Sequence, residues 1–284
     1  MTGAKIISSP LLQKSIPRTG EKIPVIGLGT YQSFDVEEGE KVRAPVRETL
    51  GEFVRQGGGM VDSSPMYGAS EGVVGDLATE LKVQPKIFYA TKVWTTGRDE
   101  GIRQMETSFK LMKTGVMDLM QIHNLVDTQT HLTTIRNWKE SGRVRYIGLT
   151  HYTERAYEDL ARAMRSEKPD FVQFNYSIVE REAEEKLLPL ANELGIAVIA
   201  NRPFAQAALF QKVRGIELPD WAKDYDIISW AQFFLKFIVS HPAVTCAIPA
   251  TGKIAHLKDN MAAGLGRLPD KAVREKMAKL ISEI

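Results

Sequence analysis

The sequence has only one cysteine, Cys246, in 284 residues. A single thiol excludes an internal disulfide and any metal cluster built on several cysteines. No apolar run reaches the about 18 residues that span a bilayer, and the N-terminus lacks the basic-then-apolar layout of a signal peptide. We therefore expect a cytoplasmic protein without membrane contact. An exported protein whose signal segment is absent from this chain would give the same pattern.

Neither sign of charge dominates, since 37 Lys and Arg residues face 35 Asp and Glu residues. The formal net charge is +2 and there is no long basic run, so nucleic-acid binding has little support. The five histidines do not show the spacing of metal ligands, which argues against a metal-assisted hydrolase and predicts no metal site. They are His123, His131, His151, His241 and His256.

Short apolar segments alternate with amphipathic ones along the whole chain. The segments that predict strands are 23–30, 60–62, 87–92, 118–123, 144–150, 171–176, 196–201 and 244–249. Helical spacing follows at 37–55, 71–81, 99–113 (with Asp99 as N-cap), 132–139, 154–164, 182–194, 229–240 and about 270–284. Eight such units predict an α/β fold, a (β/α)8 TIM barrel, as one domain over residues 1–284.

The alternative to the barrel is an open, doubly wound sheet. That fold normally has a Gly-x-Gly-x-x-Gly turn, and the stretch from Gly27 to Gln32 lacks the third glycine. A tight turn at 18–21 between short apolar pieces predicts an N-terminal β-hairpin, which we expect at the bottom of the barrel.

Three successive predicted strands end in a side chain that can do chemistry. Asp62, Lys92 and His123 close these apolar runs, and Tyr67 follows Asp62 in a Ser/Pro turn. Taken singly, each residue is more often a cap, a solvated group or a packing residue. Because the strands of a barrel end at its active-site face, we expect all four side chains to converge.

A phenol, an ammonium, a carboxylate and an imidazole together can protonate a carbonyl oxygen. A free phenol has a pKa of about 10, and a nearby ammonium favours the phenolate, so we expect Lys92 to lower the pKa of Tyr67. Asp62 would hold Lys92 in place, and His123 would hydrogen-bond the same oxygen. Tyr67 is then the general acid in carbonyl reduction. No side chain supplies hydride, so a nicotinamide or flavin cofactor is required.

At these residues the sequence resembles the aldo-keto reductase family over nearly its whole length. The matching motifs are Gly27-Leu28-Gly29-Thr30, Asp62 with Tyr67-Gly68, Thr91-Lys92-Val93-Trp94, 118–124, 142–150 and Ile248-Pro249-Ala250-Thr251. The resemblance implies a (β/α)8 barrel that binds NADPH without a glycine-rich fingerprint. It also implies a catalytic tetrad of Asp62, Tyr67, Lys92 and His123.

The resemblance carries over to the cofactor site with several departures. Thr150 and His151 stand where the family usually has Ser–Asn, Gln173 matches the family's Gln at the nicotinamide amide, and Asn201 replaces a stacking Tyr. The remaining expected cofactor residues are Gly29, Thr30, Tyr31, Asp62, Arg202, Pro203, Phe204, Thr251, Lys253, His256 and Asn260. Ala250 and His256 occupy positions where many members have Lys and Arg for the 2′-phosphate. NADPH is therefore expected, with NADH possible.

Tyr31, Met66 and Trp94 are the expected substrate-pocket residues, with a small carbonyl compound as the substrate. Monomers are common in the family, so we expect a monomer. The leading hypothesis is an NADPH-dependent carbonyl reductase. The alternative is a protein that binds the nucleotide as a redox sensor with little turnover.

Overall fold

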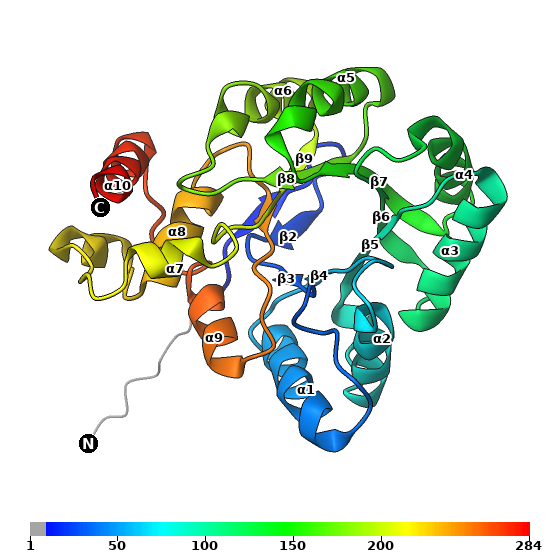
Figure 1. The fold of residues 1–284 in the computed structure, drawn as a ribbon, viewed down its shortest axis with the longest axis horizontal. Coiled ribbons are helices and arrows are strands. Elements are labelled where there is room, and N and C mark those ends of the chain that lie inside the picture. The colour runs from blue at the N-terminus through cyan, green and yellow to red at the C-terminus, as the bar shows by residue number, and fades with distance from the viewer. Residues whose placement is uncertain (1–9) are drawn as a thin grey trace.

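A curled sheet of eight parallel strands forms the centre of the computed structural model, which describes residues 10–284 (Figure 1). The strands follow one another around the sheet in chain order. They are β3 (Leu28–Gly29), β4 (Met60–Asp62), β5 (Phe88–Val93), β6 (Met117–His123), β7 (Val144–His151), β8 (Phe171–Asn175), β9 (Ala197–Asn201) and β10 (Cys246–Ala247). This arrangement is the predicted (β/α)8 barrel.

The first and last strands meet and close the barrel. Parallel bridges join Ile26 to Ala247 and Gly29 to Ala250. A Cβ atom on Gly29 would lie 2.8 Å from the backbone oxygen of Ile248, so the two backbones can approach this closely only at a glycine. An open, doubly wound sheet has no such contact, and that alternative is wrong.

Helices surround the sheet and bury their apolar faces against it (Figure 1). In the first helix, for example, Val46, Leu50 and Phe53 recur at helical spacing and are all buried. The helices between strands are α1 (Glu40–Arg55), α2 (Ser70–Glu80), α3 (Arg98–Leu111), α4 (Thr128–Glu140), α5 (Tyr157–Glu167), α6 (Leu187–Leu194), α7 (Ala208–Lys212) and α8 (Trp230–Val239). After β10 follow α9 (Ile254–Ala262) and α10 (Lys271–Glu283). The 3₁₀ turns are η1 (Gln84–Lys86), η2 (Glu154–Ala156), η3 (Glu182–Glu184) and η4 (Asp220–Tyr225).

The predicted N-terminal hairpin is present. β1 (Gln13–Ser15) pairs antiparallel with β2 (Lys22–Pro24). Ile16 and Ile23 of the hairpin belong to the same buried cluster as Met60, Phe88 and Phe171, which begin three barrel strands. The hairpin therefore covers the end of the barrel at which the strands start, as expected, and leaves the opposite end to the active site.

Several predicted boundaries are wrong. The strand expected at 23–30 is divided between β2 and β3, and the strand expected at 244–249 is only β10. The third helix begins at Arg98 because Gly97, with φ +84°, is its N-cap, so Asp99 lies in the first turn. Helix α9 was not predicted, since only three of its nine residues are buried and the apolar period is weak.

Candidate active site

The barrel brings three of the predicted strand-end residues to one place. Asp62 ends β4, His123 ends β6, and Lys92 is the penultimate residue of β5. The Lys92 Nζ atom donates to Asp62 Oδ2 at 2.7 Å and to the backbone oxygen of Ser63 at 2.6 Å. The Lys92 side chain is 0% exposed. A charged lysine is buried completely only when it is paired, as this one is.

The Asp62 carboxylate is held by two further donors. Its Oδ1 atom accepts from Gln121 Nε2 at 3.1 Å and from Gln173 Nε2 at 3.0 Å. Both glutamines are buried inside the barrel. Sequence reasoning missed Gln121, although it lies two residues before His123 in the same strand, and side chains two apart in a strand point the same way.

Tyr67 joins this group from the turn between β4 and α2. Its ring centroid lies 5.1 Å from Lys92 Nζ and 6.3 Å from the ring centroid of His123. The following residue, Gly68, has φ +55°, and a Cβ atom there would lie 2.2 Å from Asp35 Oδ1. Since Asp35 Oδ1 also accepts from the Ala69 N–H at 2.8 Å, Gly68 allows the turn to hold Tyr67 in place. The four groups predicted from the strand ends thus converge.

Burial is the largest single influence on the pKa of Tyr67, Lys92 and His123. It raises the pKa of Tyr67 above the ordinary phenol value, although Lys92 acts in the opposite direction. The predicted effect of Lys92 is therefore present but is outweighed. For Lys92 the burial effect is in turn outweighed by Asp62 and Tyr67, and its pKa is raised. Burial, with a smaller effect of Lys92, lowers the pKa of His123 to about 3. At neutral pH the phenol and the imidazole are both uncharged.

The residues expected at the nicotinamide amide lie beside Asp62, Tyr67, Lys92 and His123, which we call the acid–base group. Thr150 Oγ1 is 3.4 Å from Gln173 Oε1, and Gln173 is bonded to Asp62. Thr30 Oγ1 lies 3.0 Å from the Asp62 backbone oxygen. Asn201 Oδ1 is buried and has no hydrogen-bond partner among residues 10–284. A buried acceptor without a donor is a feature that a bound amide can satisfy.

Other expected cofactor residues follow the ends of later strands. The ring of His151 stacks on Tyr152, with centroids 5.9 Å apart. The Tyr152 ring also contacts Arg202, whose guanidinium lies 5.2 Å from the ring centroid. Pro203 is buried, and Phe204 packs on Phe210 with centroids 4.8 Å apart.

The residues expected near the 2′-phosphate surround the N-terminus of α9. Thr251 Oγ1 accepts from the Lys253 N–H at 3.1 Å, and Lys253 is the N-cap residue of the helix. His256 lies in the first turn, and Asn260 is buried farther along. A helix N-terminus with a lysine beside it is suited to an anionic group.

The expected substrate residues are exposed around the acid–base group. Tyr31, Met66 and Trp94 are 52%, 41% and 42% exposed, so their apolar surfaces are open to a ligand. Tyr31 lies 5.0 Å from Tyr67 and Trp94 lies 6.5 Å from His123, measured between ring centroids. Sequence reasoning missed Gln104, whose amide bonds both the N–H and the backbone oxygen of Trp94, at 2.6 and 3.2 Å.

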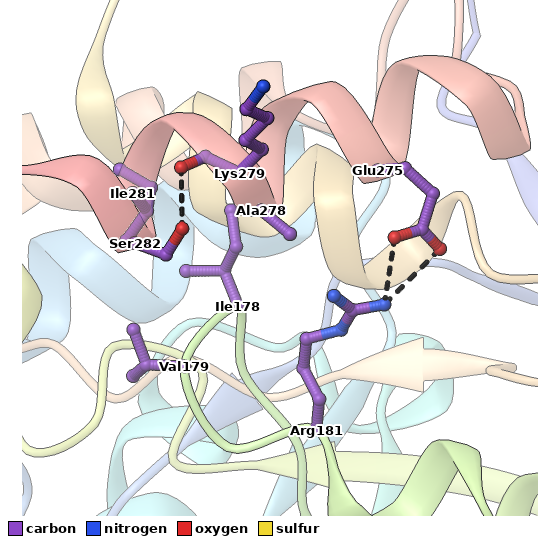
Figure 2. Close-up of a pocket in the computed structure, with 8 residues that line it drawn as sticks. All are labelled: Ile178, Val179, Arg181, Glu275, Ala278, Lys279, Ile281 and Ser282. Atoms are coloured by element: carbon purple, nitrogen blue, oxygen red, sulfur yellow. Dashed lines mark hydrogen bonds and ion pairs between the residues drawn. The ribbon is translucent and has the colours of Figure 1, made fainter.

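A separate pocket lies between α10 and the loop after β8 (Figure 2). It measures about 400 Å³, and Ile178 and Val179 are among its apolar lining residues. Its Arg181 and Glu275 bond each other at 3.3 Å. No expected site residue lines it, so it is distinct from the acid–base group. Within residues 10–284 there is no cluster of three potential metal ligands and no helix long and apolar enough to cross a membrane.

Known proteins share both the sequence pattern and the fold. The profile of the Aldo/keto reductase family matches residues 25–280. Methylglyoxal reductase YeaE of Escherichia coli is 27% identical over 260 residues, which cover 88% of this chain and 89% of that protein.

Solved structures extend this similarity. An aldo/keto reductase from Klebsiella pneumoniae, crystallised with NADP and acetate, is 23% identical with a TM-score of 0.81, covering 95% of this chain and 96% of that one. The thermostable aldo-keto reductase Tm1743, in complex with the inhibitor epalrestat, is 26% identical with a TM-score of 0.77, covering 96% and 99%. The chain belongs to the aldo/keto reductase family of oxidoreductases.

Proposed function

We propose that this protein reduces aldehydes or ketones to alcohols with NADPH, and that Tyr67 is the general acid. The observation that carries the proposal is the buried Lys92–Asp62 ion pair beside the Tyr67 ring. A fully buried ion pair costs several kcal/mol in lost hydration and is weak support for stability. Next to a phenol, however, the Lys92 ammonium can stabilise the negative charge of the phenolate that forms when Tyr67 gives up its proton.

The role of each side chain follows from its charge and contacts. Tyr67 carries its proton at neutral pH, since burial raises its pKa, and it gives that proton to the carbonyl oxygen. Lys92 stabilises the phenolate that remains, and Asp62 keeps Lys92 charged and in position. His123 is neutral and directs a hydrogen bond to the same oxygen. NADPH supplies the hydride when it is bound.

The residues present fit such a cofactor. Thr150 and Gln173 offer hydrogen bonds to the nicotinamide amide, as does Asn201 Oδ1, which has no partner in the part of the chain that the structure describes. Arg202 and the N-terminus of α9 with Lys253 offer positive charge to phosphates. Gly29, Thr30, Tyr31, Asp62, His151, Pro203, Phe204, Thr251, His256 and Asn260 complete the proposed contact set. NADPH-bound aldo-keto reductases with this fold support the choice of cofactor, and NADH remains a second candidate.

Tyr67→Phe tests the central role. Methylglyoxal and an activated aromatic aldehyde are suitable substrates, and NADPH consumption is followed at saturating cofactor. We expect kcat to fall about 10²- to 10⁴-fold, with the Kd for NADPH, from cofactor fluorescence, nearly unchanged. Tyr89→Phe is the matched control, because Tyr89 is a buried phenol on β5 whose hydroxyl has no hydrogen-bond partner in the described part of the chain. Full activity of Tyr67→Phe would remove Tyr67 from its role.

The redox-sensor alternative predicts a different result in the same assay. It requires tight NADPH binding without turnover of aldehydes, ketones or quinones by the unmodified protein. A sensor has no need for a buried ammonium beside a phenol, so the geometry favours the reductase.

We further propose that residues 1–284 act as one domain, as a monomer in the cytoplasm. The closed sheet and the continuous layer between it and the helices support one cooperative unit. A cytoplasmic location would supply reduced nicotinamide nucleotide. Sedimentation equilibrium at micromolar concentration tests the oligomeric state, two resolved unfolding transitions would contradict the single domain, and cell fractionation tests the location.

A further inference from the structure

Ser64 contacts both His123 and the turn that carries Tyr67, the two side chains that the proposed function assigns to the substrate oxygen. It begins the turn that carries Tyr67, since the Tyr67 N–H donates to the Ser64 backbone oxygen at 2.9 Å. Its hydroxyl is 3.1 Å from His123 Nδ1, and the residue is 0% exposed. Ser64 therefore links the turn of the general acid to the imidazole. It has no role in the function proposed above.

The contacts of this hydroxyl decide the direction of its bond to His123. Ser64 Oγ already accepts from the Met66 N–H at 3.3 Å, and the hydroxyl has one hydrogen to donate. Among the contacts that the structure gives this hydroxyl, His123 Nδ1 is the only acceptor. If Nδ1 carried a proton, the Ser64 oxygen would receive two donors and its own hydrogen would be buried without an acceptor. Such a loss is penalised strongly in a buried site, so Nδ1 is the acceptor.

The charge of His123 completes the assignment. Burial lowers the pKa of His123 to about 3, so the ring is neutral near pH 7 and carries one N–H. With Nδ1 accepting from Ser64, that N–H is at Nε2, on the other side of the ring. The rings of Tyr67 and Trp94 lie near this imidazole, with centroids 6.3 and 6.5 Å away.

We propose that Ser64 is a positioning residue that fixes His123 in the Nε2–H tautomer, so that the ring presents a hydrogen-bond donor to the substrate carbonyl. The catalytic part of this inference rests on the proposed function, whereas the tautomer itself does not. An imidazole without this constraint would populate both tautomers, and only one of them can donate toward the substrate.

The direct test is ¹H–¹⁵N NMR of the imidazole rings in the protein saturated with NADPH near pH 7. The His123 signal is assigned by its loss in His123→Gln. We expect the unsubstituted protein to show a proton on Nε2 and a bare Nδ1, Ser64→Ala to show a mixture of tautomers, and Ser64→Thr to restore the original pattern. A proton on Nδ1 in the unsubstituted protein would overturn the proposal, whether or not Ser64→Ala folds.

Kinetics separate this role from a structural one. Ser64→Ala should lower kcat about two- to tenfold, the effect of one net hydrogen bond, with the KM for NADPH unchanged. Ser64→Thr should recover most of kcat. Ser108→Ala is the matched control, because Ser108 is equally buried and its hydroxyl bonds a backbone oxygen within α3. It should leave kcat and the His123 signal as they were.

The two proposals can fail separately. If His123 is the Nε2–H tautomer and Ser64→Ala gives a mixture of tautomers, but the protein reduces no carbonyl compound, the tautomer assignment stands and the reductase proposal is refuted. If the protein reduces carbonyl compounds but Ser64→Ala changes neither kcat nor the His123 signal, only the role of Ser64 is refuted.

Discussion

Removing either charge of the Lys92–Asp62 pair should destabilise the whole barrel. The Nζ–Oδ2 distance is 2.7 Å, and the two side chains are 0% and 3% exposed. At an effective dielectric constant of about 20, the Coulomb attraction at this distance is about 6 kcal/mol, and it offsets most of the several kcal/mol that burying each ion costs. A single charge left behind loses that compensation.

The two single variants are Lys92→Met and Asp62→Asn. Lys92→Met leaves the carboxylate with the two neutral amide donors of Gln121 and Gln173. Asp62→Asn leaves the ammonium with the Ser63 backbone oxygen. We expect each variant to lower the free energy of unfolding by about 3–5 kcal/mol, the usual cost of breaking a buried pair from one side.

The double variant, D62N with K92M, should lose no more than either single variant. It removes both charges, so no unpaired ion stays buried, and the coupling energy between the two sites should be about 3–5 kcal/mol. Urea unfolding at pH 7 measures all three losses as shifts of the midpoint at constant slope.

The exposed pair of Glu100 and Arg103 on α3 supplies the control cycle. These side chains are 52% and 66% exposed, and water already screens their charges, so we expect no measurable coupling between E100Q and R103M. If the losses of D62N and K92M simply add, the two ions do not depend on each other. The account of how Lys92 stabilises a phenolate at Tyr67 would then be refuted.

Three further outcomes follow from the same structure. His123, with its pKa lowered to about 3, takes up a proton only in the unfolded chain between about pH 6.5 and pH 3, so acidification should destabilise the protein, by about 2 kcal/mol at pH 5 from this residue. In His123→Gln the urea midpoint should therefore fall less between pH 7 and pH 5 than in the unsubstituted protein, and an equal fall would contradict this. Lys253→Ala should raise the Kd for NADPH about tenfold and leave the Kd for NADH nearly unchanged, and equal weakening of both by fluorescence titration would place the lysine elsewhere on the cofactor. Gly68→Ala should lower the melting temperature and kcat, because its added methyl group meets Asp35 in a left-handed turn. Gly142→Ala, at φ +76° with open space around it, should lower the melting temperature less, through backbone strain alone. A larger loss of melting temperature in Gly142→Ala than in Gly68→Ala would argue against the contact with Asp35.

The sequence was sufficient to predict the barrel and the convergence of Asp62, Tyr67, Lys92 and His123. Asp62 and His123 end short apolar runs, Lys92 lies one residue before the end of another, and the carboxyl ends of parallel strands lie on one face of a barrel. This prediction needed only the position of each residue in its strand. The hairpin followed in the same way from a turn at 18–21 between two apolar segments.

What could not be predicted depends on distances between parts of the chain. Ser64 contacts His123 across 59 positions, and a serine in a Ser/Pro turn gives no sign of this partner. The link from Gln104 on α3 to Trp94 depends on how the helix packs on the loop. The direction of the Tyr67 pKa shift was also missed, because burial opposes Lys92 and only the folded structure gives the extent of burial.

The protonation states indicate the direction in which this site works best. Burial raises the pKa of Tyr67 and lowers that of His123, so at neutral pH both groups hold a proton that they can share with an oxygen atom. Reduction of a carbonyl begins from this state. In the proposed mechanism, oxidation of an alcohol needs Tyr67 as the phenolate, which burial disfavours and which Lys92 only partly stabilises. The same pocket that brings the four groups together should therefore favour carbonyl reduction near pH 7, with alcohol oxidation becoming faster only as the pH rises toward the raised pKa of Tyr67.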